Sequence, residues 1–216
     1  MFTQMVDDIL LQIGVVLLVV VTFLFIYNVP QRVLATLRLR LHSKSAIQSK
    51  RHFVLGAQLL DQARSSSSDA ASLFKQALDH ADKAIALEPK DAAAHILKAL
   101  ALDAQGFKTS ALDAIDVALS PLCRKSLVDA ERGDALFKRA EIKMSMNRSR
   151  RVDSVVGDLT AAVELSPENA NAFCLLGECY EEKKMTEQAK KAYEEALKLR
   201  PRFAAAKEAL DRLGSS

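Results

Sequence analysis

The spacing of large, small and aromatic residues between Ala170 and Pro201 constrains the fold of this chain more than any other feature. Four of them share one face of a first helix, three share one face of a second, and a proline closes the unit. In order they are Phe173, Leu176, Gly177 and Tyr180, then Ala189, Tyr193 and Ala196, then Pro201. Small Gly177 and Ala189 let the helices approach closely, and Pro201 ends the second helix. The segment is predicted to form a helical hairpin.

This order of residues resembles the tetratricopeptide repeat, whose pattern is W-x2-L-G-x2-Y, then A-x3-F-x2-A, then proline. Phe173 stands where the family prefers tryptophan. One hairpin cannot bury its own apolar face, so the resemblance implies neighbouring repeats. The predicted fold class is all-α: a superhelix of about four hairpins with a capping helix, preceded by one N-terminal transmembrane helix.

Weaker copies of the pattern place the repeat array over residues 45–213. The predicted units are residues 45–89, 92–121, 133–167 and 170–201, followed by a cap over residues 202–213. The first unit is degenerate, and a run of serines lengthens its turn, as expected of a terminal repeat. The cap carries apolar residues on one face only, which suits a helix that shields the end of an array.

Composition agrees with an all-helical array and gives no sign of catalytic chemistry. Half of the 216 residues are hydrophobic, only 6% are aromatic, and no sustained alternating run indicates strands. His80 and His95 fall in different units, the three cysteines lack metal-binding spacing, and no glycine-rich phosphate loop occurs. We predict no enzyme, cofactor, metal site or small-molecule substrate.

Residues 9–27 form a 19-residue stretch without a charge, after a short acidic N-terminus over residues 1–8. As a helix this stretch would span roughly 28 Å, close to the thickness of a bilayer core. The prediction is an uncleaved transmembrane signal anchor. A cleaved signal peptide and a buried helix are the alternatives, although Asp7 and Asp8 do not suit the positive start of a signal peptide.

Basic residues gather after this stretch. No acidic residue lies between Asp8 and Asp61, and the remainder of the chain is close to neutral, which argues against a nucleic-acid partner. Residues 28–44 are a predicted basic juxtamembrane segment, in which four residues either contact anionic headgroups or only set the topology: Arg32, Arg38, Arg40 and Lys44. The charge asymmetry predicts an outside or lumenal N-terminus and a cytosolic array. Three membranes stay open: endoplasmic reticulum, mitochondrial outer membrane and plastid outer envelope.

The resemblance also implies a concave groove, lined by the first helices of successive units, that binds peptides or helices. Transferred position by position, the groove residues are Ile96, Leu100, Asp103, Asp134, Phe137, Glu141, Met144, Asn171, Cys174, Glu178 and Glu181. This apolar set with an acidic bias favours a basic, amphipathic protein partner, although exposed helix charges need no partner. The clamp that some relatives use for acidic chaperone tails is not predicted, because its cations are missing; Phe53 and Ala57 stand at two of its positions.

The predicted function is therefore a membrane-anchored adaptor or scaffold that binds a protein partner through its helical groove. The alternative is an accessory structural subunit of a membrane protein complex, for assembly or import, with contacts through the convex face or the transmembrane helix.

Overall fold

The computed structural model describes residues 12–22, 29–65, 69–146 and 148–214. All regular structure in these ranges is helical, so the all-α prediction is confirmed for them. The chain divides into two units, residues 1–47 and residues 48–216, and each is described by itself.

The predicted transmembrane helix is wrong for the part of the chain that the structure describes. Residues 9–11 and 23–27 lie outside the described residues, and the helix between them covers residues 12–22. The next helix, α2 (Val29–Ser65), is long enough but carries many charges. No described helix combines the length and apolar character needed to cross a membrane.

The predicted localisation loses its basis with that helix. A single-pass topology with an outside N-terminus and a cytosolic array required the anchor. The membrane-surface role of Arg32, Arg38, Arg40 and Lys44 depended on it as well. These four residues lie in α2, where Lys44 is exposed to solvent.

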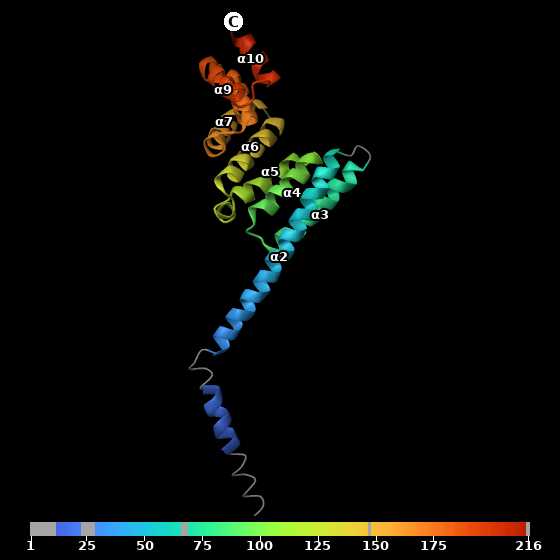
Figure 1. Cartoon of the computed structure of the whole chain (residues 1–216), viewed down its shortest axis with the longest axis vertical. Helices are drawn as coiled ribbons and strands as arrows, with labels where there is room; N and C mark the ends of the chain where they lie inside the picture. Colours follow the sequence, from blue (N-terminus) through green and yellow to red (C-terminus); the bar gives the residue numbers. More distant parts are fainter. Residues whose placement is uncertain (1–11, 23–28, 66–68, 147, 215–216) are drawn as a thin grey trace, which may run out of the picture. The chain divides into compact units, whose positions relative to one another are not determined.

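The second unit is a succession of antiparallel helical hairpins (Figure 1). Its helices are the C-terminal part of α2, then α3 (Ala70–Leu87), α4 (Ala92–Ala104), α5 (Lys108–Leu119), α6 (Asp129–Met146), α7 (Arg148–Leu165), α8 (Ala170–Glu182), α9 (Thr186–Leu199) and α10 (Ala204–Gly214). A short 3-10 helix, η1 (Arg124–Ser126), lies between α5 and α6. Each helix from α3 onward packs against the next, so the core is shared between neighbours.

Caps and turns define where the hairpin helices begin and end. The carboxylate of Asp91 accepts the backbone N–H of Ala93 at the start of α4, and the Asn169 side chain accepts that of Ala172 at the start of α8. The turns after α4 and α8 each need a left-handed residue, supplied by Gly106 at φ +85° and Lys184 at φ +59°. These signals give the α4–α5 and α8–α9 hairpins the same kind of tight turn.

The α8–α9 hairpin closes around Tyr193, which is only 1% exposed. Its ring lies directly over Gly177, where an added Cβ would come within 2.6 Å of the ring carbon Cε1. Its hydroxyl donates a hydrogen bond to Glu181 Oε1 at 2.6 Å. Ala189 and Ala196 are fully buried beside it. The glycine thus provides the space that the aromatic ring fills.

A mostly buried ion cluster joins α5, α6 and α7. Asp158 accepts hydrogen bonds from Arg139 Nε at 3.0 Å and from Lys143 Nζ at 2.7 Å. Arg139 also reaches Asp116 at 2.9 Å. One buried carboxylate between two cations is well compensated for its loss of water. The cluster therefore ties two neighbouring hairpins together by polar contacts.

We predict that Gly177→Ala lowers the free energy of unfolding by about 1–3 kcal/mol, because the new methyl group overlaps the buried Tyr193 ring. Urea denaturation followed by circular dichroism measures the change. Gly157→Ala is the matched control: a Cβ there has no neighbour within 4 Å, so it should be neutral or stabilise α7 by up to about 1 kcal/mol. Equal effects of the two variants would contradict this account of Gly177.

A histidine pair between α2 and α3 predicts acid sensitivity. The Nδ1 atoms of His52 and His80 lie 2.9 Å apart. Burial lowers the pKa of His80 below its ordinary value, and His52 and Lys83 lower it further, against the opposing effect of Asp79. The fold therefore favours neutral His80, and its stability should fall as pH drops below about 6.5 towards the folded-state pKa. Urea denaturation between pH 8 and pH 5 should show a shallower loss in His80→Gln than in the wild type. Parallel curves would rule out this contribution.

Candidate binding groove

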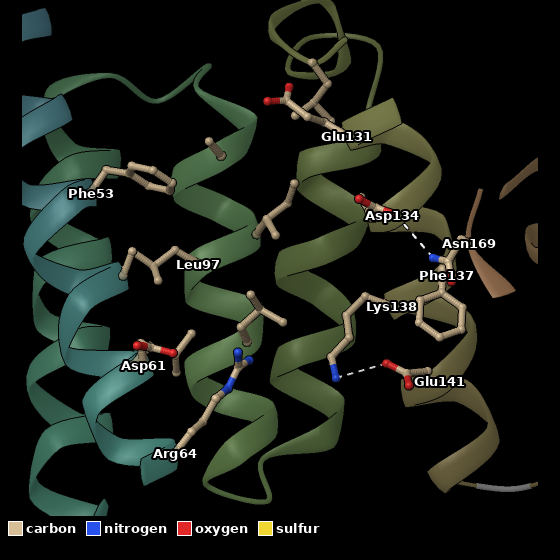
Figure 2. Close-up of a pocket in the computed structure, with 17 residues that line it drawn as sticks. Phe53, Asp61, Arg64, Leu97, Glu131, Asp134, Phe137, Lys138, Glu141 and Asn169 are labelled. Carbon is tan, nitrogen blue, oxygen red and sulfur yellow. Dashed lines mark hydrogen bonds and ion pairs between the residues drawn. The ribbon is translucent and has the colours of Figure 1, made fainter. Parts of the chain in front are cut away.

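A groove of about 650 Å³ opens on the first helices of three successive hairpins, α2, α4 and α6, and on the start of α8 (Figure 2). Its surface is mostly apolar. The apolar side chains include Phe53 and Leu60 from α2, Ile96 and Leu100 from α4, and Phe137 from α6. Such a concave apolar surface with a few polar groups is what binding sites for proteins and ligands share.

Helical spacing brings these side chains to one face. Along α6, Asp134, Phe137, Lys138 and Glu141 follow i, i+3, i+4 and i+7. Along α4, Ala93, Ile96, Leu97 and Leu100 repeat the same spacing. This shared face of the first helices is called the inner face below. The periodic spacing of the repeats therefore builds the groove directly.

Charged residues lie at both ends of the groove (Figure 2). Glu131 and Asp134 lie at the end where α6 begins, and Asp134 Oδ1 accepts a hydrogen bond from Asn169 Nδ2 at 3.3 Å. Asp61 and Arg64 lie at the other end, close to where α2 finishes, with Lys138 and Glu141 across from them on α6.

Lys138 is held by carboxylates on both sides. Its Nζ atom lies 3.0 Å from Asp103 and 3.2 Å from Glu141. Asp103 also pairs with Lys108 at 2.5 Å. Burial alone would lower the pKa of Lys138, but Asp103 and Glu141 outweigh it and raise that pKa. Lys138 thus stays charged, and its charge is compensated within the protein.

The predicted groove residues separate into three groups. Five of them line this groove: Ile96, Leu100, Asp134, Phe137 and Glu141. Asp103 binds Lys108 and Lys138 instead, and Met144 packs against the α7–α8 core, with its Sδ atom 4.0 Å from Cys179 Sγ.

The remaining four predicted residues lie on α8, away from this groove. Asn171 accepts a hydrogen bond from Arg200 at 3.2 Å, and Cys174 is buried. Burial, followed by the charge of Glu178, raises the pKa of Cys174 to about 11, so its thiol stays protonated. Glu178 and Glu181 line a second, more polar cavity of about 510 Å³ between α8 and α10. There Glu181 binds Arg212 at 2.8 Å.

Several groove residues were not among the predicted ones. Phe53, Ala57, Leu60, Asp61 and Arg64 all come from the first hairpin. Their spacing places them on one helical face, which is a signal present in the sequence. None of the predicted groove residues comes from this hairpin, and Phe53 and Ala57 were predicted to stand at positions where a cationic clamp would need other residues. Leu127, Glu131 and Asn169 adjoin helix starts, where repeat spacing gives no guidance.

No catalytic or metal-binding arrangement emerges in the part of the chain that the structure describes. His80 contacts His52, and the Nε2 atom of buried His95 lies 3.0 Å from the carbonyl oxygen of Pro89. No three metal-ligating side chains of the described residues gather in one place.

Comparison with known proteins finds a family match for one hairpin of the array. Residues 170–203 match the tetratricopeptide repeat family model. No curated protein matches the sequence. The match covers the hairpin α8–α9, the unit in which the repeat spacing is clearest.

Solved structures share the fold at low sequence identity. MamA residues 41 to the end, from Desulfovibrio magneticus RS-1, align with a TM-score of 0.61 at 18% identity, covering 78% of this chain and 84% of that one. PilF of Pseudomonas aeruginosa aligns with a TM-score of 0.62 at 20% identity, covering 79% and 69%. A thermophilic TPR protein of Thermus thermophilus aligns with a TM-score of 0.54 at 18% identity, covering 76% and 80%.

The family match identifies residues 170–203 as a tetratricopeptide repeat, and the solved structures share the fold of most of the chain. At these identities the structural similarity establishes the fold alone. The residues of the groove must therefore be interpreted from their own chemistry.

We predict that Asp103→Asn lowers the free energy of unfolding by about 1–3 kcal/mol at pH 7, because charged hydrogen bonds to Lys108 and Lys138 are lost. Burial raises the pKa of Asp103, but these two lysines outweigh it and hold the pKa below its ordinary value. The stabilisation is complete above about pH 3.9 and is lost as pH falls through the folded-state pKa. Urea denaturation from pH 7 to pH 3 should therefore show a difference that narrows in acid. Asp113→Asn, at an exposed position on α5, is the control and should change little.

Proposed function

We propose that this protein is a protein-interaction scaffold whose groove between α2, α4 and α6 binds an amphipathic segment of a partner protein. The observation that carries the proposal is the groove itself: an apolar surface of about 650 Å³, shared by three hairpins, with charged residues at its ends. Repeat proteins of this architecture use such extended inner faces for binding.

The chemistry of the groove supports a helical occupant. Its apolar residues come from several helices and form one continuous cavity, which suits the apolar face of an amphipathic helix. Such a helix presents apolar residues at i, i+3, i+4 and i+7. The polar residues along the edges of this apolar stripe would contact the charged residues at the ends of the groove. Buried apolar area would supply affinity, and the edges would supply specificity.

Peptide display against the full chain tests this proposal. Selected peptides should carry apolar residues at helical spacing and gain helical circular dichroism when they bind. Ile96→Gln combined with Leu100→Gln should weaken their binding by about tenfold or more, because each change puts a polar amide into the apolar surface. Isothermal titration calorimetry measures the affinities.

Leu199→Gln provides the matched control. Leu199 lies on α9, is 42% exposed and lines neither cavity, so its replacement should leave peptide affinity unchanged. Circular dichroism and thermal unfolding confirm that each variant is folded before affinities are compared. Equal binding by the wild type and the Ile96/Leu100 variant would overturn the proposed function.

A further inference from the structure

The charges around the groove are not equally available to a partner. Lys138 is compensated by Asp103 and Glu141, and these contacts also occupy the two carboxylates. Glu131 accepts the backbone N–H of Val128 at 3.1 Å, and Asp134 accepts the Asn169 amide. Both of these donors are neutral. Among the described residues no cation pairs with Glu131 or Asp134, and no carboxylate pairs with Arg64.

These three charges lie at opposite ends of the groove. Glu131 and Asp134 are near the start of α6, while Arg64 is in the last turn of α2 (Figure 2). Apolar side chains such as Leu97 and Phe137 lie between them (Figure 2). The groove thus offers an acidic end and, at the other end, the cation of Arg64 with the carboxylate of Asp61 near it, separated by an apolar floor.

We propose that the occupant is an amphipathic helix with lysine or arginine on the edge beside Glu131 and Asp134, and an acidic residue on the edge beside Arg64. This inference rests on the proposed function of the groove and specifies the chemistry of its partner. Charge complementarity across an apolar contact sets orientation and selects against wrong partners. Glu141 contributes little to this selection because Lys138 already neutralises it.

The same charges also suit their own helices. Glu131 lies in the first turn of α6 and Arg64 in the last turn of α2, where each stabilises the helix dipole. A purely intrahelical role would not depend on the charge of a bound peptide. The deciding measurement must therefore vary both the protein and the peptide.

The experiment uses three peptides with one common apolar stripe. The first carries lysines on one edge and glutamates on the other; the second replaces the lysines with glutamine; the third replaces the glutamates with glutamine. Each is titrated into the full-length wild type, the double variant Glu131→Gln/Asp134→Asn, and Arg64→Gln. A second double variant, Asp113→Asn/Glu164→Gln, removes the same number of carboxylates from α5 and α7, away from the groove.

The double variant Glu131→Gln/Asp134→Asn should bind both lysine-bearing peptides about three- to tenfold more weakly than the wild type, and should bind the lysine-free peptide equally well. Arg64→Gln should lose affinity only for the two peptides that carry glutamate, and by a smaller factor. It should bind the glutamate-free peptide as tightly as the wild type does. Both differences in affinity between variant and wild type should shrink at high salt, because Glu131, Asp134 and Arg64 are exposed to solvent. The control double variant should match the wild type.

Losses that are the same for all three peptides, or absent for all, would overturn the charge assignment and leave the groove as a binding site. If Ile96→Gln/Leu100→Gln bound the peptides as tightly as the wild type, the proposed function would be overturned instead. The same holds if no peptide bound to the wild type. Light scattering adds a separate outcome. A dimer that dissociates in Ile96→Gln/Leu100→Gln would show a second copy of the chain as the occupant and contradict the proposal.

Discussion

Close approach of helices at small residues is the constraint on which the rest of this structure depends. Gly177 leaves room for the Tyr193 ring, and alanines such as Ala99, Ala140 and Ala196 are fully buried where helices pack. A core built from such small side chains keeps the helix axes near each other, so the inner faces of successive hairpins adjoin. The groove is a consequence of that spacing, because three inner faces together form its surface.

The periodic part of the fold could be predicted from the sequence because repetition supplies the same signal several times. The α8–α9 hairpin carries the full pattern, and its neighbours carry enough of it to be recognised as helices. The N-terminal region offered a different signal, an uncharged run over residues 9–27. Hydropathy measures the solvent that a segment prefers, whereas a membrane-spanning helix must also be continuous over about 20 residues. No described helix combines that length with the apolar character of a membrane span, so composition alone was not a sufficient guide there.

The location of the candidate site on the first helices was predictable from the sequence. The ion pairs that its charged residues form were not. Position-by-position transfer found Ile96, Leu100, Asp134, Phe137 and Glu141 in the groove. It gave no information about pairing between helices: Asp103 binds Lys138 across the α4–α6 contact, and Glu181 binds Arg212 of α10. Sequence spacing reports which face of a helix a charge occupies, but its partner comes from another helix and depends on tertiary packing.

The division of the inner face into two cavities follows from the end of the array. Along α10, Ala205, Glu208, Ala209 and Arg212 repeat the spacing by which α6 lines the groove, so α10 takes the place of a further first helix. Its Arg212 binds Glu181, and Arg200 binds Asn171, so the α8 section of the inner face is engaged by the C-terminal residues. The cavity there keeps several carboxylates and little apolar surface. The apolar floor is thereby confined to α2, α4 and α6, together with charges that no ion pair neutralises among the described residues. This restricts the candidate binding site to the N-terminal half of the array.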